Sequence, residues 1–350
     1  MVISSSQLGG AEKQFLLTTR KLLSLYDIQI CIIGKPGPRL ESYQSIGVPI
    51  AISKGTLFSD IKTLVRSLLD FHPNTVISWL YRADILSCIF SKLIFRAKII
   101  TSARNTKLPN STWLKEKTIR FTYNNLSDVV VANSEKAKAY HVFIGVKQEK
   151  IHVIPNFVES VPIRQKRLLS SQYRIGVLAR KVPYKGHLEA IAVANALVKR
   201  GHKILLSFIG NGPFLKDLKV NRLVDEGCSL EDLEGVLDLN EWFSNLDLLL
   251  ALSTKWDSDS NATIEAISRG IPVVCSPLQS TEGLLKEMTI VDPHDPMKIA
   301  LEIERIIGMD MHARNNWLIR QRNKLLISRD SQSLTQRWVN VIEETGGEEC

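Results

Sequence analysis

The feature that most constrains this chain is a repeated alternation of short apolar runs with longer amphipathic segments. Short apolar strands that alternate with helices are typical of a parallel, doubly wound sheet. In the first half the pattern predicts strands at 28–34, 74–80, 97–102, 129–133 and 151–156, and helices at 58–71, 84–96, 113–125 and from Glu135 onward, with Ser134 as an N-cap. In the second half it predicts strands at 173–180, 203–210, 248–252 and 271–275, and helices at 186–200, 214–227 and from about Ser260. The chain is therefore predicted to be an α/β protein.

The alternation is interrupted once, by a segment rich in proline, serine and basic residues. A chain of 350 residues is too long for one ordinary core, and two domains are the natural expectation. We therefore predict two Rossmann-like, doubly wound domains that face each other across a cleft. Their expected bounds are 1–160 and 173–310, with a linker at 161–172 and a helical tail at 311–350 that packs back towards the first domain.

Composition narrows the class of protein. The chain is 44% apolar and 23% charged, as in ordinary globular proteins. It has no uninterrupted apolar run of about 18 residues, and its first residues lack the pattern of a signal peptide. The five cysteines form no CxxC pair, and the seven histidines show no metal-ligand spacing. These features predict a cytoplasmic protein with no bound metal and no cofactor.

The net charge of +9 is unevenly distributed. Residues 1–160 hold 21 Lys and Arg against 11 Asp and Glu, whereas residues 161–350 hold 24 against 25, so the first half carries the whole excess. A basic domain suits an anionic membrane, a phosphorylated ligand or nucleic acid, although a solvated surface with a lysine bias fits it too. Segment 84–96 is apolar with a basic end, which fits a core helix better than a membrane-surface helix.

The segment from Leu248 to Ser276 is the strongest candidate for a ligand site. It is predicted to form a buried strand, a polar loop, a helix that ends at Gly270 and a second buried strand. Ligands of open α/β sheets bind beyond the carboxyl ends of the strands. Asp257 in the loop and Glu265 in the helix are separated by seven residues, so the two acids can reach one ligand from two sides.

Two further loops follow predicted strands. Arg180 and Lys185 lie in RKVPYKG, where the planar fork of an arginine and the point charge of a lysine can neutralise a diphosphate. Gly210 and Gly212 follow the next strand. Taken alone, these residues could be exposed cations and a tight turn, but their position after successive strands favours a ligand site.

Gly9 and Gly10 lie between a short first strand and a helix. Backbone amides at such a turn can meet a phosphate or a sugar. A tight turn alone would also explain two glycines.

The order of these motifs resembles that of the retaining family-4 glycosyltransferases, which have the GT-B fold. The second half carries the Arg-x4-Lys-Gly loop, the turn Ile-Gly-Asn-Gly-Pro, and Asp-x7-Glu-Ala before Gly-Ile-Pro-Val-Val. The first half carries Gly-Gly-Ala-Glu near its start, then VVVANSE and IHVIPNFVE. The resemblance covers essentially the whole chain. It implies a hexosyltransferase-type enzyme that moves a sugar from a nucleotide-diphosphate sugar to a hydroxyl acceptor.

The resemblance also implies a role for each candidate residue. Arg180 and Lys185 would hold the donor diphosphate, and Asp257 would face the donor sugar near its reacting carbon. Glu265 would bind the ribose hydroxyls. The other positions that would contact the donor are Gly210, Gly212, Asn261, Thr263, Glu282, Gly9 and Gly10, and Arg104 would contact donor or acceptor.

Several positions depart from the family pattern. The family usually has a glutamate at the position of Asp257, and often Gly-Phe-Gly or Gly-Phe-Pro where this chain has residues 258–260. A glycine pair is often found where residues 278–282 stand here, and a histidine is often found near residues 78–81. The sequence therefore leaves open whether Asp257 or Asp259 acts at the sugar.

The mechanism that the resemblance implies needs neither a strong base nor a metal, because the departing phosphate can take the acceptor's proton. The protein would position the reactants and stabilise charge. The basic first domain fits a glycan or lipid-linked acceptor at an anionic membrane, as in O-antigen, lipopolysaccharide or capsule biosynthesis. We expect a peripheral contact with the inner face of that membrane.

Three alternatives remain from the sequence. A non-catalytic GT-B protein that binds nucleotide-sugars or a partner would explain the departures. A two-Rossmann epimerase or dehydrogenase is disfavoured, because no G-x-G-x-x-G follows a first strand. Nucleic-acid binding would explain the charge, but no motif supports it.

Overall fold

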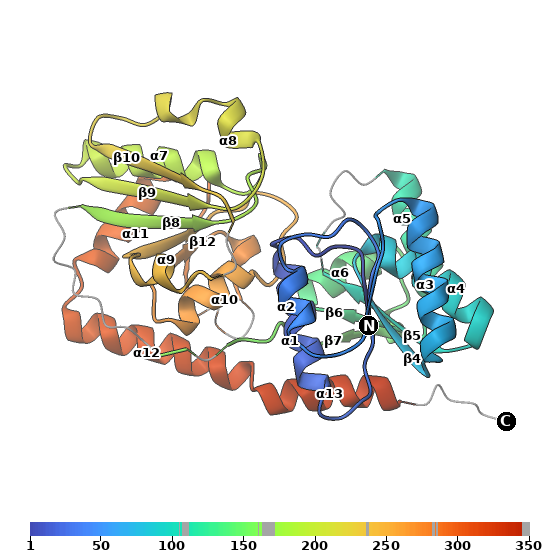
Figure 1. Ribbon diagram of the computed structural model, residues 1–350. Helices are drawn as coiled ribbons and strands as arrows, with labels where there is room; N and C mark the ends of the chain where they lie inside the picture. Colours follow the sequence, from blue (N-terminus) through green and yellow to red (C-terminus); the bar gives the residue numbers. More distant parts are fainter. Residues whose placement is uncertain are drawn as a thin grey trace. The chain divides into compact units, whose positions relative to one another are not determined.

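The chain divides into two compact units (Figure 1). Unit 1 consists of Met1–Phe157 together with the segment from Asp330 onward, and unit 2 is Val158–Arg329. The structure is a computed structural model. It describes residues 1–104, 106, 112–159, 161–162, 172–235, 238–281, 284 and 286–344, and for residues 95 and 221 it describes the backbone only.

In the described part of the chain, unit 1 holds a seven-stranded sheet in the order β3-β2-β1-β4-β5-β6-β7, and each neighbouring pair is parallel. The strands are β1 (Val2–Ile3), β2 (Ile30–Ile32), β3 (Ile50–Ile52), β4 (Thr75–Trp79), β5 (Lys98–Ala103), β6 (Val129–Ala132) and β7 (Ile151–Val153). The helices are α1 (Gly10–Leu22), α2 (Leu40–Gln44), α3 (Leu57–Phe71), α4 (Tyr81–Phe95), α5 (Trp113–Asn125), α6 (Glu135–Phe143) and α13 (Ser331–Glu343).

The two faces of this sheet carry different cores. Successive strand side chains point to opposite faces, and β2 shows the alternation. Ile30 and Ile32 pack with residues of α1 and α13, whereas Cys31 packs with residues of α3 and α4. The sheet is therefore covered on both faces, as the prediction of a doubly wound fold requires. The predicted N-cap is also confirmed, because Ser134 Oγ accepts from the amide of Ala137 at 3.1 Å.

The last helix completes the core of unit 1. The indole of Trp338 on α13 stacks on that of Trp79 at the end of β4, with ring centroids 5.5 Å apart and an interplanar angle of 21°. Phe15 of α1 meets Trp79 edge to face at 5.6 Å. All three rings are buried. A helix at the end of the chain thus supplies a central residue of the first unit's core.

Among the described residues, unit 2 holds a six-stranded parallel sheet in the order β10-β9-β8-β11-β12-β13. Its strands are β8 (Tyr173–Leu178), β9 (Ile204–Ile209), β10 (Cys228–Leu233), β11 (Leu248–Ala251), β12 (Val273–Cys275) and β13 (Thr289–Ile290). Its helices are α7 (His187–Lys199), α8 (Phe214–Asp217), α9 (Asn240–Ser244), α10 (Asn261–Ser268), α11 (Pro296–Ile307) and α12 (Met311–Ser328).

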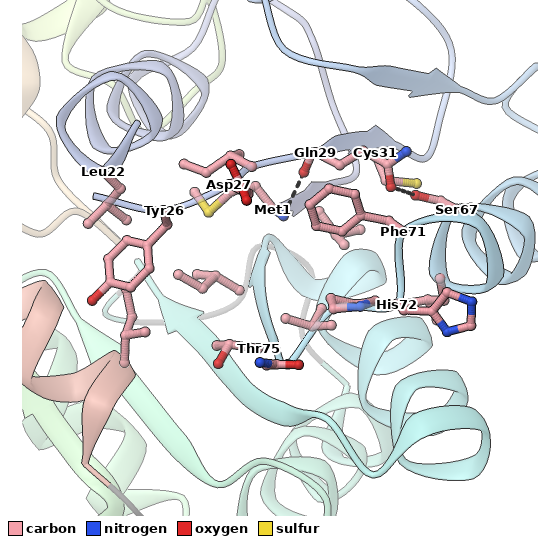
Figure 2. A pocket seen from close by; sticks show the side chains of 18 of the residues that line it. Met1, Leu22, Tyr26, Asp27, Gln29, Cys31, Ser67, Phe71, His72 and Thr75 are labelled. Carbon is pink, nitrogen blue, oxygen red and sulfur yellow. Dashed lines mark hydrogen bonds between the residues drawn. The ribbon is translucent and has the colours of Figure 1, made fainter. Parts of the chain in front are cut away.

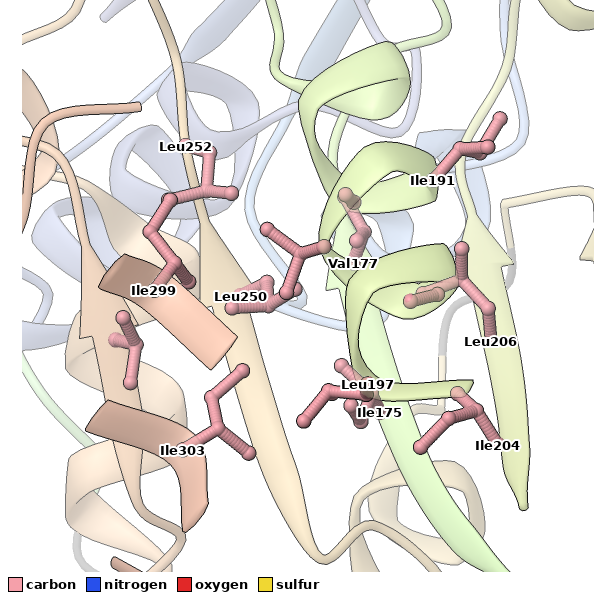
Figure 3. Packing of buried hydrophobic residues seen from close by; sticks show 14 of the residues in the cluster. Ile175, Val177, Ile191, Leu197, Ile204, Leu206, Leu250, Leu252, Ile299 and Ile303 are labelled. Atoms are coloured by element: carbon pink, nitrogen blue, oxygen red, sulfur yellow. The ribbon is translucent and has the colours of Figure 1, made fainter. Parts of the chain in front are cut away.

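Unit 2 is also packed on both faces. Figure 3 shows side chains of α7 and α11, such as Ile191 and Ile303, against Val177 and Leu250 of the central strands. On the other face, α9, α10 and α12 pack against β11 and β12. The prediction of two doubly wound α/β units is therefore confirmed.

Some predicted elements were wrong or missing. The helix predicted at 214–227 is only the single turn α8 followed by a short 3₁₀ helix, Val220–Arg222. Lys219 has a φ of 48°, a left-handed conformation that ends the first turn. Three edge strands, β3, β10 and β13, were not predicted: β10 mixes polar and apolar residues, and β3 and β13 are only three and two residues long.

The tail predicted at 311–350 consists of two helices in its described part. α12 belongs to unit 2, and α13 belongs to unit 1. Asp330 separates them and caps α13 by accepting from the amide of Ser333 at 2.7 Å. Most of the predicted linker, 163–171, lies outside the described residues.

Within the ranges that the structure describes, each helix is too short or too polar to span a bilayer.

We predict that Trp338→Ala destabilises the protein by about 3–5 kcal/mol, because it removes a buried ring from the core of unit 1. Urea unfolding followed by circular dichroism measures the change. The control is Trp113→Ala, whose ring is 73% exposed and whose loss should cost no more than about 0.5 kcal/mol. Equal effects of the two substitutions would contradict the packing role of Trp338.

Candidate functional site

The predicted site residues of unit 2 follow neighbouring strands. Lys185 lies in the loop after β8, and Asp257 lies in the loop after β11. β8 and β11 are adjacent at the centre of the sheet, where the strand order reverses. Because the strands are parallel, both loops leave from the same edge. This reversal point is where open α/β sheets bind ligands.

Lys185 and Asp257 form an ion pair. Lys185 Nζ lies 2.7 Å from both Oδ1 and Oδ2 of Asp257. The side chains keep 13% and 16% of their exposed area, respectively. The sequence spacing placed these residues at the same sheet edge, and the structure brings them into direct contact.

Two more groups donate to the same carboxylate. Gln279 Nε2 lies 2.7 Å from Asp257 Oδ2, and the Ser253 hydroxyl also hydrogen-bonds to Asp257. Burial alone would raise the pKa of Asp257. The charge of Lys185 and the hydrogen bonds from Lys185, Ser253 and Gln279 outweigh burial, and the pKa lies below its ordinary value. Asp257 is therefore an ionised acid at neutral pH.

The nearby acid Asp259 has a different partner. Arg329 at the end of α12 donates to Asp259 Oδ2 from Nη1 at 2.8 Å and to Oδ1 from Nη2 at 2.5 Å. Both side chains are almost completely buried, at 1% and 2% exposure. The structure thus separates the two acids whose roles the sequence left open. Asp259 joins α12 to the loop, whereas the Asp257 side chain stays partly accessible, at 16% exposure.

Arg180 and Lys181 are adjacent in the sequence but differ in burial and in side-chain contacts. Arg180 is exposed, and its side chain has no hydrogen-bond or ion-pair partner among the residues that the structure describes. Lys181 is buried, pairs with Asp232 at 2.5 Å and donates to the carbonyl of Leu233 at 2.7 Å. The sequence did not single out Lys181. Its role is to join the loop after β8 to the end of β10.

Gly210 and Gly212 allow two loops to touch. Their φ angles are 148° and 139°, and an added Cβ would lie 1.9 Å from the carbonyl oxygen of Ala179 and 2.4 Å from that of Lys181, respectively. The amide of Lys181 also donates to the carbonyl of Asn211 at 2.9 Å. These glycines therefore hold the loops after β8 and β9 together. A contact with a nucleotide stays a prediction.

The remaining unit 2 candidates lie on or beyond α10. Ser260 caps this helix through the amide of Thr263, and the Thr263 side chain is buried in the interior. Asn261 and Glu265 are half-buried, and Oε2 of Glu265 is inaccessible to solvent. Glu282 lies outside the described residues.

In unit 1, Gly9 precedes α1 and Gly10 begins it. The carboxylate of Glu12 lies so close to Gly9 that an added Cβ would meet Oε2 at 2.2 Å. Ser5 Oγ donates to the other oxygen of Glu12 at 2.6 Å. Gly9 leaves room for the Glu12 carboxylate, and its φ of −134° is one that any residue adopts, so the backbone does not require a glycine there.

Arg104 is held in place at the carboxyl edge of the unit 1 sheet. Its Nε donates to Ser102 Oγ and its Nη1 to Asn156 Oδ1, each at 2.7 Å. The guanidinium carbon lies 4.3 Å from the ring centroid of Trp79, a favourable cation–π distance. The guanidinium is therefore fixed in position at the strand ends.

A buried acid that the sequence did not reveal lies close to Arg104. Asp84 accepts from Ser78 Oγ at 2.6 Å and from the Tyr123 hydroxyl at 2.9 Å. Burial raises the pKa of Asp84 to about 7, although these hydrogen bonds and the charge of Arg104 oppose the rise. The carboxyl edge of unit 1 thus contains an acid that titrates near neutral pH.

A cavity of about 590 Å³ lies at the opposite end of the unit 1 strands (Figure 2). Met1, Gln29 and Thr75 line it at the amino ends of β1, β2 and β4. None of the predicted site residues lines this cavity. It is therefore separate from the loops described above.

Among the described residues, no group of three or more His, Cys, Asp or Glu side chains could hold a metal ion.

The two parallel α/β units with these loops define a GT-B fold. Anabaena HepE in complex with UDP-glucose aligns with a TM-score of 0.84, covering 98% of this chain and 99% of that one at 15% identity. Residues 8–160 match the model of Glycosyltransferase Family 4, and residues 172–309 match that of Glycosyl transferases group 1. The chain belongs to these glycosyltransferases.

Two curated proteins of Staphylococcus aureus are similar in sequence. Protein CapJ is 29% identical over 171 residues, which are 47% of this chain and 44% of CapJ. The chain therefore matches less than half the length of that relative. The capsular polysaccharide biosynthesis glycosyltransferase CapM is 23% identical over 318 residues, with 81% of each protein covered.

We predict that Asp259→Asn and Arg329→Met each destabilise unit 2 by about 3–5 kcal/mol, because each leaves a buried group without its partner. The double variant should lose less than the sum of the two, as thermal and urea unfolding would show. Strict additivity would contradict a direct interaction between the two side chains.

Proposed function

We propose that this protein is a retaining glycosyltransferase of the hexosyl type, which moves a sugar from a nucleotide-diphosphate sugar to a hydroxyl acceptor. The observation that carries the proposal is the contact of Lys185 with the ionised Asp257 at the reversal point of the unit 2 sheet. A cation and an anion held side by side suit a donor that has an anionic diphosphate next to a sugar. The fold shared with a protein that binds UDP-glucose supports the same donor class.

In this proposal, the loop after β8 receives the diphosphate. Arg180 is exposed and without a side-chain partner among the described residues, so binding an anion breaks no existing contact. Lys185 is already at the site and can be shared between the diphosphate and Asp257. The two cations would neutralise the charge that develops as the diphosphate leaves, which is the basis for proposing transfer without a metal.

The chemical step requires one bond to form and one to break at the anomeric carbon. The acceptor oxygen forms the new bond to that carbon, and the bond to the diphosphate oxygen breaks. The departing phosphate takes the acceptor's proton on the same face, which preserves the configuration. Asp257 would stabilise the positive charge that develops on the sugar, and Glu265 would hold the ribose.

The acceptor proposal comes from the relatives and from the charge of unit 1. CapM is named for capsular polysaccharide biosynthesis, and a glycan of that kind is the acceptor class that we propose. O-antigen and other lipopolysaccharide chains share the same chemistry when they grow on a lipid carrier. A lipid-linked acceptor places the enzyme at the cytoplasmic face of a membrane, and the excess of 10 positive charges in residues 1–160 suits that surface.

One helix of unit 1 has the surface that such a contact needs. Trp113, Leu114 and Phe121 on α5 are 73%, 64% and 59% exposed. Their spacing puts them on one side of the helix, together with Lys117, whose Nζ lies 4.8 Å from the Trp113 ring centroid. Exposed aromatic rings beside lysines suit the interface of an anionic membrane. We propose this α5 surface as the membrane contact.

The non-catalytic alternative loses one of its supports. The departures at 258–260 and 278–282 suggested a decayed site, but Asp259 is engaged by Arg329 and Gln279 by Asp257. These side chains are integrated in the site, so the departures give no reason to propose a loss of activity.

We predict that Asp257→Ala lowers sugar transfer at least about a hundredfold, the loss typical of removing a charge-stabilising group. Binding of the nucleotide, measured by calorimetry, should change less than about tenfold. The assay uses UDP-, GDP- and ADP-sugars in buffer with EDTA. Normal turnover by the variant would overturn the role of Asp257, and a strict need for added magnesium would overturn the metal-free form of the proposal.

The control for this test is Asp70→Ala. Asp70 is an exposed acid on α3 that pairs with the exposed Arg66, and its loss should leave turnover unchanged. A wild-type protein that binds nucleotide-sugars without hydrolysing or transferring the sugar would favour the non-catalytic alternative.

We predict that the double variant Trp113→Ser, Phe121→Ser binds phosphatidylglycerol-containing vesicles at least about tenfold more weakly than wild type. Each buried ring contributes ~1.5–3 kcal/mol to such binding. Vesicle flotation measures the effect, with pure phosphatidylcholine vesicles as the uncharged comparison. Ile327→Ser, at a 77% exposed position of unit 2, is the matched control. Equal binding by the variant and wild type would exclude the α5 surface.

A further inference from the structure

Gln279 occupies an unusual position for an uncharged side chain. It ends a short 3₁₀ helix, Pro277–Gln279, that follows β12, and it is 5% exposed. Its amide nitrogen lies 2.7 Å from Asp257 Oδ2 and also contacts Ser253 Oγ. The loop after β12 therefore reaches the acid that the loop after β11 presents.

The orientation of the Gln279 amide is determined by its neighbours. The Ser260 hydroxyl lies 3.4 Å from Oε1, and the carboxylate of Asp257 lies next to Nε2. An ionised carboxylate accepts hydrogen bonds and cannot donate them. A flipped amide would place its oxygen against that carboxylate, so the arrangement with Nε2 towards Asp257 is the one that satisfies both groups.

Lys185 and Gln279 hold Asp257 in different ways. Lys185 contacts both carboxylate oxygens, but its charge is also what a diphosphate would attract. Gln279 is neutral and is anchored by Ser253 and Ser260, so an arriving anion does not draw it away. A carboxylate has room for about four hydrogen-bond donors, and both residues can act on it together.

We propose that Gln279 is a positioning residue for sugar transfer, which keeps Asp257 oriented and ionised when Lys185 turns to the donor diphosphate. This inference rests on the proposed function. Ser253 assists Gln279, since it also hydrogen-bonds to Asp257 and its own carbonyl is held by the Ser276 hydroxyl at 2.7 Å. Asp257 would otherwise lose its strongest partner at the moment when the sugar arrives.

The inference predicts a specific change in Gln279→Met, a variant that keeps the volume but removes the donor. The kcat for transfer or for donor hydrolysis should fall about tenfold to a hundredfold, the range expected for losing one hydrogen bond to a charged group. The KM for the nucleotide-sugar and the affinity for the free nucleotide should stay within about twofold, because the variant leaves Arg180 and Lys185 unchanged.

The pH profile separates positioning from a structural role. The hydrogen bond from Gln279 lowers the pKa of Asp257, so its loss raises that pKa. Activity requires the ionised acid, and the acid limb of kcat against pH should therefore move to higher pH in Gln279→Met. Gln279→Glu should move it further, because a second carboxylate would face the first.

The matched control is Gln321→Met, the same substitution at an equally buried glutamine of α12 that donates to the carbonyl of Glu287. It should leave kcat and the pH profile unchanged while it reports the stability cost of the substitution. If Gln279→Met has wild-type kcat and an unmoved acid limb while Asp257→Ala is inactive, the inference is wrong and the proposed function stands. If wild type itself does not turn over any donor, the proposed function is wrong.

Discussion

The parallel direction of every neighbouring strand pair is the constraint on which the site depends. Parallel strands send the loops that follow them to one edge of the sheet, whatever their distance in the sequence. The strand order of unit 2 then decides which loops meet. It places β8 beside β11, so that the loop with Lys185 lies next to the loop with Asp257. β12 comes next in the order, and its loop adds Gln279. The site is thus a direct result of the strand order. It is completed by the carboxylate of Asp257 and its two hydrogen-bond donors, Lys185 and Gln279.

The fold could be predicted where strands lie inside a sheet. The segments around β6 and β11 are buried on both faces, and their continuous apolar runs identify them without other information. The edge strand β10 has the sequence CSLEDL, in which Glu231 accepts hydrogen bonds from Arg174 of β8 and Ser207 of β9. Those partners are distant in the sequence, so the segment does not look like a strand. The helix that was wrongly predicted at 214–227 has a related cause. Helical spacing of apolar residues cannot reveal that Lys219 leaves the helical conformation.

The site could be predicted to a similar degree. Residue types after strand ends indicated Lys185 and Asp257, and motif order gave the family. Sequence could not show which of two nearby acids remains accessible, because the answer depends on Arg329, which lies 70 positions after Asp259. Nor could it assign Gln279, since a glutamine has no chemistry of its own that marks a site. Its proposed role can be inferred only from the short distance between its amide nitrogen and the Asp257 carboxylate. In general, a side chain that acts by positioning another residue cannot be identified from a single sequence.

The stacking of Trp338 on Trp79 has a consequence for the order in which the two units fold during synthesis. A ribosome synthesises the chain from its amino end to its carboxyl end, and domains generally fold as units during synthesis. Unit 2 is one continuous segment, Val158–Arg329, and all of it has been made before α13 begins. Unit 1 starts first but waits for α13 to cover Trp79 and Phe15. The two units would therefore finish folding in the reverse of the order in which they begin. A chain truncated before Ser331 would hold the whole of unit 2 but would lack the helix that covers Trp79 and Phe15 in unit 1.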